Sequence, residues 1–254
     1  MRIVSYNILD GGEGRADPLA ETIEAQRPDV VALVEATDKA VVERIANRLG
    51  MDYIQAIGNR QASALLTKYT IRDTVNHALL HKGLSKSLLE AMIIDAHGQP
   101  WVFGVLHLQH HHTEADERNR EAELEIVLDI FARHRGDQVP HILAGDFNAD
   151  SPVQEIDPAK LKASSREAYD ANGGQLPRRV IQKLLDAGYM DTLAIAEPAL
   201  AKTAGTFTTQ HPGQRVDYIF VHSLDASRIT AAGVETDRLA KYASDHFPVF
   251  AEIG

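Results

Sequence analysis

Residues 142–150 read Ile-Leu-Ala-Gly-Asp-Phe-Asn-Ala-Asp. An apolar run that closes on a glycine predicts a buried strand that ends at a turn. Because side chains alternate along a strand, Asp146 and Asn148 are expected on the same side of its exit. A carboxylate and an amide placed together could activate a water and hold an oxyanion. An isolated Gly-Asp-x-Asn also fits an ordinary Asx-type turn, so the rest of the chain has to decide.

The bulk composition indicates one globular domain. The chain has 254 residues and 44% of them are hydrophobic, which is enough for one large core. Apolar segments recur along its whole length, without a Pro/Ser-rich linker, a low-complexity tract or an internal repeat. We therefore interpret residues 1–254 as a single catalytic domain.

The composition also excludes classes of site. Cysteine is absent, which rules out disulfides, thiolate catalysis and zinc–thiolate sites and fits a cytoplasmic location. The N-terminal residues already read as a strand, so no signal peptide is expected. No apolar run approaches the roughly 18 residues of a transmembrane segment. The net charge of −10 weighs against a dedicated nucleic-acid-binding module, but a nuclease can carry a local basic groove.

Predicted strands and helices interleave along the chain. Strands are expected at residues 2–8, 29–35, 63–67, 88–95, 101–108, 142–146 and 215–221, and residues 244–253 are expected to form a loop that turns into a terminal strand. Helices are expected at residues 18–26, 41–49, 114–134 and 180–187. The strands at 88–95 and 101–108 are expected to pair as a hairpin. We interpret the glycines at 11, 12 and 14 as a flexible loop and residues 151–176 as a polar surface excursion. This order favours mixed sheets covered by helices.

Polar side chains recur where the predicted strands begin or end. The positions are Asn7, Glu35, His107, Asp146 with Asn148, Asp217, and Asp245 with His246. Each one alone is more often a turn, a cap or a structural side chain, but six such positions together favour one convergent site. Oxygen donors and histidines without thiolates suit Mg²⁺ or Mn²⁺ better than zinc.

In this order the motifs resemble the endonuclease/exonuclease/phosphatase superfamily, the deoxyribonuclease I-like hydrolases. The resemblance spans residues 6–250 and depends most on Gly-Asp-Phe-Asn at 145–148 and Ser-Asp-His-Phe-Pro-Val at 244–249. It implies an α+β fold, a four-layer α/β/β/α sandwich of two mixed β-sheets flanked by helices. It also implies hydrolysis of phosphoester bonds with a divalent metal ion, Mg²⁺ or Mn²⁺.

The resemblance assigns roles to the metal side of the site. Glu35 would be the principal metal carboxylate, and Asn7 would hold metal or phosphate beside it. Asp245 would be a second acidic contact to the metal. Many members of the superfamily have glutamine before the metal-binding glutamate, whereas this chain has Val34. Asp10 is interpreted as a solvated loop residue, with an accessory ligand as the alternative.

The resemblance also assigns the reacting groups. Asp146 would orient or deprotonate the attacking water, with Asn148 positioning the water or the phosphate. His246, oriented by Asp217, would stabilise the transition state, and His107 would contact phosphate or act as general acid for the leaving oxygen. Some members pair the counterpart of His107 with an acidic residue, for which no candidate is found here.

We expect a monomeric metal-dependent phosphoester hydrolase, specifically a phosphodiesterase acting on nucleic acid or a small phosphodiester. A sphingomyelinase-like phospholipase C is the alternative enzyme, because segment 107–109 resembles that branch, and a catalytically silent binding domain is the alternative of another class. The three histidines at 110–112 are interpreted as an exposed polar loop that could instead grip phosphate. The candidate local cations, most of them expected to be solvated, are Arg60, Lys68, Lys82, Lys86, Arg118, Arg178, Arg179 and Arg215.

Overall fold

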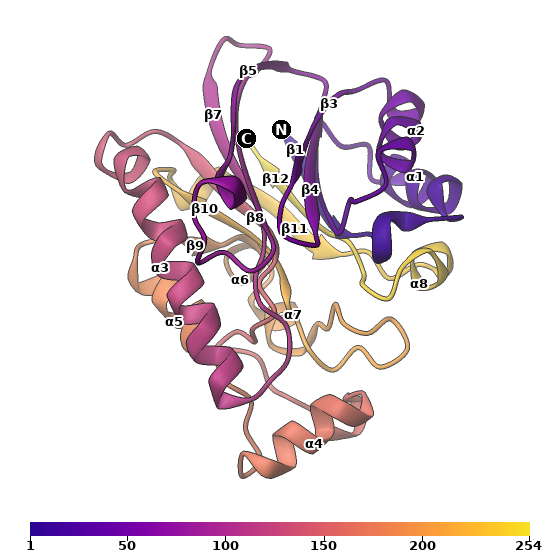
Figure 1. The fold of residues 1–254 in the computed structure, drawn as a ribbon, viewed down its shortest axis with the longest axis vertical. Coiled ribbons are helices and arrows are strands. Elements are labelled where there is room, and N and C mark those ends of the chain that lie inside the picture. Colours follow the sequence, from indigo (N-terminus) through magenta and orange to yellow (C-terminus); the bar gives the residue numbers. More distant parts are fainter.

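Two six-stranded β-sheets stack face to face in the computed structural model, which describes residues 1–254 (Figure 1). The first sheet has the order β11 (Ile229–Val234), β12 (Val249–Ile253), β1 (Arg2–Asn7), β2 (Val30–Val34), β4 (Ala62–Thr67) and β3 (Asp52–Ile57). The second has the order β5 (Thr70–Asn76), β6 (Ser87–Ile94), β7 (Pro100–His107), β8 (His141–Asp146), β10 (Asp217–His222) and β9 (Met190–Asp191). Each sheet is mixed, with one parallel pair, β1 with β2 and β7 with β8.

Helices cover the outer face of each sheet. The first sheet is covered by α1 (Ala16–Ala25) and α2 (Lys39–Leu49), next to the short α8 (Arg238–Ala243). The second sheet is covered by α3 (Glu114–Gly136) and α5 (Arg179–Asp186). The predicted four-layer α/β/β/α sandwich is therefore confirmed. None of the helices is both long enough and apolar enough to cross a bilayer.

Three apolar cores follow from these layers. The largest lies between the sheets and includes Ile3, Ala32 and Phe103, while each helical layer has its own core against the outer face of a sheet. The central strands β2 and β8 bury every residue, as their continuous apolar sequences predict. Rigid central strands carry the polar residues at their ends.

The centre of the first sheet joins distant parts of the sequence. β1 pairs in parallel with β2 and antiparallel with β12, so that Ile3 faces Val30 on one side and Ala251 on the other. The main chain of residue 1 exchanges two hydrogen bonds with that of Ile253.

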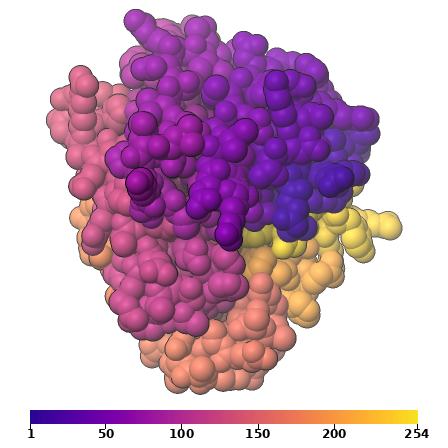
Figure 2. Space-filling view, viewed as in Figure 1, coloured from indigo at the N-terminus to yellow at the C-terminus, as the bar shows by residue number.

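Several elements were not predicted. The edge strands β3, β5 and β11 and the short α6 (Thr192–Ala196), α7 (Pro198–Thr203) and α8 lack a strong apolar period, because much of their surface faces solvent. The excursion at residues 151–176 contains a helix, α4 (Ala163–Ala171), which lies apart from both sheets. In Figure 2 this salmon-coloured segment forms the lower end of the molecule.

Candidate active site

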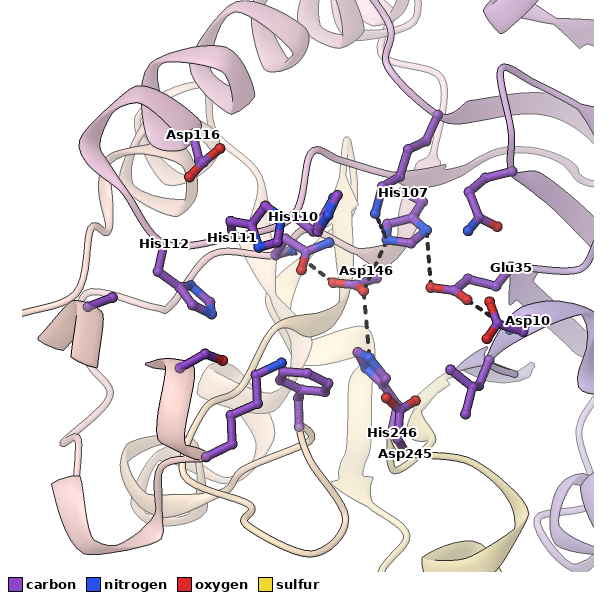
Figure 3. A pocket seen from close by; sticks show the side chains of 18 of the residues that line it. Asp10, Glu35, His107, His110, His111, His112, Asp116, Asp146, Asp245 and His246 are labelled. Carbon is purple, nitrogen blue, oxygen red and sulfur yellow. Dashed lines mark hydrogen bonds and ion pairs between the residues drawn. The ribbon is translucent and has the colours of Figure 1, made fainter. Parts of the chain in front are cut away.

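Strand ends from both sheets meet at one edge of the sandwich. Asn7 ends β1 and Glu35 directly follows β2 in the first sheet, while His107 and Asp146 end the parallel strands β7 and β8 of the second. Asp217 begins β10, which runs antiparallel to β8, and the register places it opposite Asp146. Figure 3 shows Glu35, His107 and Asp146 converging on one cavity.

The amide of Asn7 lies at the centre of the site. Its Nδ2 is 3.1 Å from Asp146 Oδ2, 3.3 Å from Glu35 Oε1 and 3.4 Å from His246 Nε2. Its Oδ1 accepts a hydrogen bond from the backbone N–H of Leu9 at 3.0 Å. In this orientation Asn7 holds the two carboxylates side by side with its nitrogen, and its oxygen faces away from Glu35.

His246 and Asp217 form a buried hydrogen-bonded dyad. His246 Nδ1 donates to Asp217 Oδ2 at 2.8 Å, and His246 Nε2 lies 3.9 Å from Asp146 Oδ2. Burial alone would lower the pKa of His246, but the carboxylates of Asp217, Asp146 and Asp245 raise it to about 10. The imidazole is therefore a cation at neutral pH, aimed at the cavity.

The turn after β8 holds Asp146 and Asn148 together. Asp146 Oδ1 accepts from the backbone N–H of Asn148 at 2.9 Å, while Asn148 Nδ2 donates to Leu108 O at 3.0 Å. Gly145 has φ +143°, and a Cβ there would lie 1.9 Å from Leu106 O, so only glycine fits. Burial and the charge of Asp217 both raise the pKa of Asp146. The Gly-Asp-x-Asn motif therefore forms an Asx turn, and the same two side chains, Asp146 and Asn148, line the cavity.

Glu35 also has strained backbone, and it organises the loop that was expected to be flexible. Glu35 has φ +57° and Asn148 has φ +49°, conformations that cost non-glycine residues about 1–3 kcal/mol and cluster at functional sites. Glu35 Oε2 accepts from Asp10 N at 2.9 Å, and Glu35 O accepts from Gly11 N at 2.8 Å. Because Gly11 and Gly12 are buried, the interpretation of this loop as merely flexible was wrong.

A lysine faces His107 where some relatives are expected to carry an acid. Lys86 Nζ lies 2.5 Å from His107 Nε2, which is itself 3.3 Å from Asp146 Oδ2. His107 Nδ1 points toward Glu35 Oε1 at 4.0 Å and has no hydrogen-bond partner. Burial, followed by the charge of Lys86, lowers the pKa of His107 well below its usual value. The imidazole is therefore neutral, which does not fit the predicted general-acid role.

The cavity has a volume of about 500 Å³ and two unlike sides. Glu35, Asp10 and Asp245 line one side, and His110, His111 and His112 line the other, with Asp146 between them (Figure 3). Asp245 is the last of the predicted metal residues, and its Oδ1 is buried without a hydrogen-bond partner. All eight predicted site residues thus lie in or directly behind one cavity.

The excursion at residues 151–176 contributes to the cavity. Lys162, Ser164 and Ala168 line it, and Lys162 Nζ lies 4.1 Å from the centre of the Phe207 ring. That ring packs on the His246 imidazole at 4.6 Å between centroids. This polar segment offered no sequence signal for a site, and its interpretation as plain surface was incomplete.

Buried charges on α3 fix the loops of the histidine side. Arg120 is 1% exposed and donates to Gln109 O and His111 O as well as to Glu117. Glu123 is 3% exposed, and its carboxylate accepts from Ser85 N at 2.8 Å and Gln109 N at 2.7 Å. This helix therefore buries these charged side chains in addition to its apolar residues Leu124, Val127 and Phe131.

The positively charged residues proposed as candidates lie in different environments. Lys86 and, outside the predicted set, Lys162 line the cavity. Arg215 is buried in a bidentate ion pair with Asp191, at 3.0 and 2.7 Å, rather than solvated. Lys86 lies beside His107 because the observed register of β6 and β7 pairs Ser87 with His107.

Comparison with known proteins was made by sequence and by structure. The chain is 27% identical over 192 residues to the uncharacterized protein YbhP of Escherichia coli strain K12, an alignment that covers 75% of this chain and 62% of the relative. The chain thus spans less than two thirds of that relative's length.

Two solved structures share the fold over the whole of this chain. One is a 3′ phosphatase from Neisseria bound to a product DNA hairpin, with a TM-score of 0.71, 20% identity and 99% of that chain covered. The other is a mannosyl-6-phosphatase from Bacteroides thetaiotaomicron, with a TM-score of 0.69, 22% identity and 99% of that chain covered. A sequence model of the Endonuclease/Exonuclease/phosphatase family matches residues 4–246. The chain belongs to this family.

Proposed function

We propose that the protein is a divalent-metal-dependent phosphodiesterase. The observation that carries the proposal is the position of the Asn7 amide, within 3.4 Å of Glu35, Asp146 and His246. It joins a carboxylate for a metal ion, a carboxylate for a water and a cationic imidazole in one cavity. Hydrolysis of a phosphoester requires these three functions. The family relationship supports phosphoester hydrolysis in general, and the diester preference and the residue roles belong to the proposal.

The attacking water is assigned to Asp146. Its carboxylate lies at the cavity floor, and its raised pKa makes it a better proton acceptor than an ordinary aspartate. Asn148 is fixed beside it by the Asx turn. In-line attack places the leaving oxygen on the far side of the phosphorus from this water. His246, a cation held by Asp217, faces the same space and stabilises charge on the phosphoryl oxygens.

The donor set fits a divalent cation on the acidic side. Glu35 and Asp245 both line this side of the cavity, and burial, together with the charge of Glu35, raises the pKa of Asp245. Glu35 and Asp245 would hold the cation, and Asn7 would join them only if its oxygen turned toward Glu35. When bound there, a divalent cation supplies neutralisation of the charge that develops on the phosphoryl group.

A second trio has ligand atoms within 4.8 Å of one another, namely Asp146, Asp217 and His246. In this trio the pKa of His246, raised to about 10 by the carboxylates around it, keeps both ring nitrogens protonated at neutral pH, and a metal ligand must leave its coordinating nitrogen unprotonated. We therefore assign the trio to water and transition-state handling and the cation to the Glu35 side.

The lining of the cavity bears on the substrate. Three of its 19 lining residues are hydrophobic, Leu9, Ala168 and Phe207, which favours a polar phosphodiester over the acyl chains of a phospholipid. Among the structural neighbours, one was solved with a DNA hairpin and another is a sugar phosphatase. Oligonucleotides and small phosphodiesters are therefore the first substrates to test, in a protein for which we propose a cytoplasmic location and a monomeric state.

The test compares bis(p-nitrophenyl) phosphate hydrolysis and plasmid nicking with Mg²⁺, Mn²⁺ or EDTA. We expect metal-dependent turnover that Glu35→Gln and Asp146→Asn each reduce by about 10³-fold or more. Glu13→Gln, an exposed carboxylate in the neighbouring loop, is the matched control and should retain full activity. The melting temperature of Glu35→Gln without metal should be almost unchanged.

Full activity of Glu35→Gln would refute the assignment of the site. Hydrolysis of the small diester without nicking would exclude an endonuclease that acts on duplex DNA. Cleavage restricted to phospholipid vesicles would favour the phospholipase C alternative, and no turnover of any ester would favour the silent binding domain.

A further inference from the structure

The contact between Lys86 and His107 is built into the second sheet. Lys86 directly precedes β6, and the β6–β7 register pairs Ser87 with His107. Lys86 Nζ therefore reaches His107 Nε2 at 2.5 Å, beside the carboxylate of Asp146. Because Lys86 Nζ can only donate, His107 Nε2 accepts this hydrogen bond and carries no proton of its own.

The ammonium group has donors left over. It carries three N–H groups, and the contact to His107 uses one. No carboxylate oxygen lies within the 4.0 Å of an ion pair with Nζ, although Lys86 lines the cavity and is only partly accessible to solvent. A partly desolvated cation with free donors, facing a cavity, is suited to bind an anion.

Contacts with neighbouring backbone atoms hold Lys86 in place beside the cavity. Asn59 N donates to Lys86 O at 3.1 Å, and a Cβ on Gly58 would lie 2.1 Å from the same oxygen. The buried Glu123 carboxylate binds Ser85 N and Gln109 N, and so ties the loop before Lys86 to the loop after His107. These contacts fix both loops independently of any substrate.

We propose that Lys86 is a catalytic residue that binds an equatorial oxygen of the phosphoryl group under attack, and that His107 is a positioning residue that accepts one of its N–H groups. The proposal rests on the proposed function. Since Asp146 holds the water and in-line attack places the leaving oxygen opposite, a cation beside Asp146 reaches the equatorial oxygens. In this role Lys86 stabilises charge as a cation and transfers no proton.

The first test uses Lys86→Met, which keeps the apolar stem and removes the charge. Its control is Lys82→Met, an exposed lysine that does not line the cavity. With methyl phosphate diesters of p-nitrophenol and phenol, we expect kcat/KM of Lys86→Met to fall about 10²-fold and by the same factor for both leaving groups. Lys86→Arg should recover part of the loss. A loss below threefold, or a much larger loss for phenol, would overturn the assignment.

The positioning role of His107 has its own test. His107→Gln keeps an acceptor for the Lys86 ammonium, whereas His107→Leu does not. We expect kcat of the glutamine variant to exceed that of the leucine variant by about tenfold at equal melting temperature. Equal kcat in the two variants would show that His107 does not act through Lys86.

A phosphate-binding measurement tests the role of Lys86 separately from the proposed phosphodiesterase activity. Calorimetric titration with inorganic phosphate needs no turnover, and we expect Lys86→Met to weaken phosphate binding about tenfold or more while Lys82→Met leaves it unchanged. Absence of phosphoesterase activity in the wild-type protein would refute the proposed function alone. Unchanged phosphate binding in Lys86→Met would refute the assignment of Lys86.

Discussion

The two sheets build unlike halves of the same cavity. The first sheet and its loops supply the acidic half, with Glu35, Asp10 and Asp245, and this half is held by hydrogen bonds of Glu35 itself. The second sheet supplies Lys86 and the histidines, and its loops are held from outside by buried charges on α3. One half thus depends on its own ligand residue, and the other depends on buried charges of a neighbouring helix.

The largest effect is expected where the two halves meet. Asp217 belongs to β10 of the second sheet, and His246 lies three residues before β12 of the first. In Asp217→Asn an oxygen can still accept from His246 Nδ1, but the charge that keeps the imidazole cationic is lost. We expect kcat to fall by about 10² to 10⁴-fold with an unchanged fold, measured by steady-state kinetics and circular dichroism.

The exposed Asp225→Asn is the control for this change, and its kcat should equal that of the wild type. A kcat of Asp217→Asn near that value would mean that the two halves act without this link.

The next effect tests the dependence of the histidine half on α3. Arg120→Met leaves the buried carboxylate of Glu117 without its partner, at a cost of about 3–5 kcal/mol in the free energy of unfolding. Arg118→Met, whose exposed ion pair with Glu114 lies on the same helix, should cost less than about 1 kcal/mol. Urea denaturation measures both, and similar small losses in the two variants would show that the loops do not need the buried charge.

The smallest effect concerns the free energy of unfolding at acidic pH. His141 begins β8 of the second sheet, donating from Nδ1 to Val139 O at 2.8 Å and accepting at Nε2 from the Tyr189 hydroxyl at 2.9 Å. Burial lowers its pKa to about 4, and its other charged neighbours, His134, His222 and Arg135, add to the shift. The unfolded chain, with a pKa near 6.5, then binds more protons than the folded one, so stability is lost as pH falls from about 6.5 toward 4.

We expect His141 to account for about 2–3 kcal/mol of the loss at pH 4.5, so that His141→Gln loses less stability than the wild type by about that amount. Other histidines, such as His112, whose pKa is lowered by burial to about 4, contribute equally to both curves. His97→Gln, in the exposed hairpin turn, should follow the wild-type curve. Unfolding free energies measured at several pH values test this prediction. Parallel curves for the wild type and His141→Gln would show that His141 does not cause the loss of stability in acid.

The sequence predicted the strand ends better than the contacts between them. Glu35 and Asp146 follow apolar runs, and Asn7 ends a strand of alternating character, so their exit from buried strands could be read directly. Lys86 precedes its strand and enters the cavity only through the pairing of β6 with β7, a register that no local pattern specifies. Arg120 and Glu123 read as surface charges, because their partners are backbone atoms of loops distant in sequence.

The pairing of β1 with both β2 and β12 bears on how the protein is made. Asn7 lies on a central strand that gains its second neighbour only when residues 249–253 are available. A ribosome adds about 5–20 residues per second, so tens of seconds pass between the emergence of β1 and that of β12. During that time β1 has an open edge and His246 is not yet in place. The growing chain is thus expected to be hydrolytically silent until its last strand is added, and to depend on chaperones to shield the open sheet.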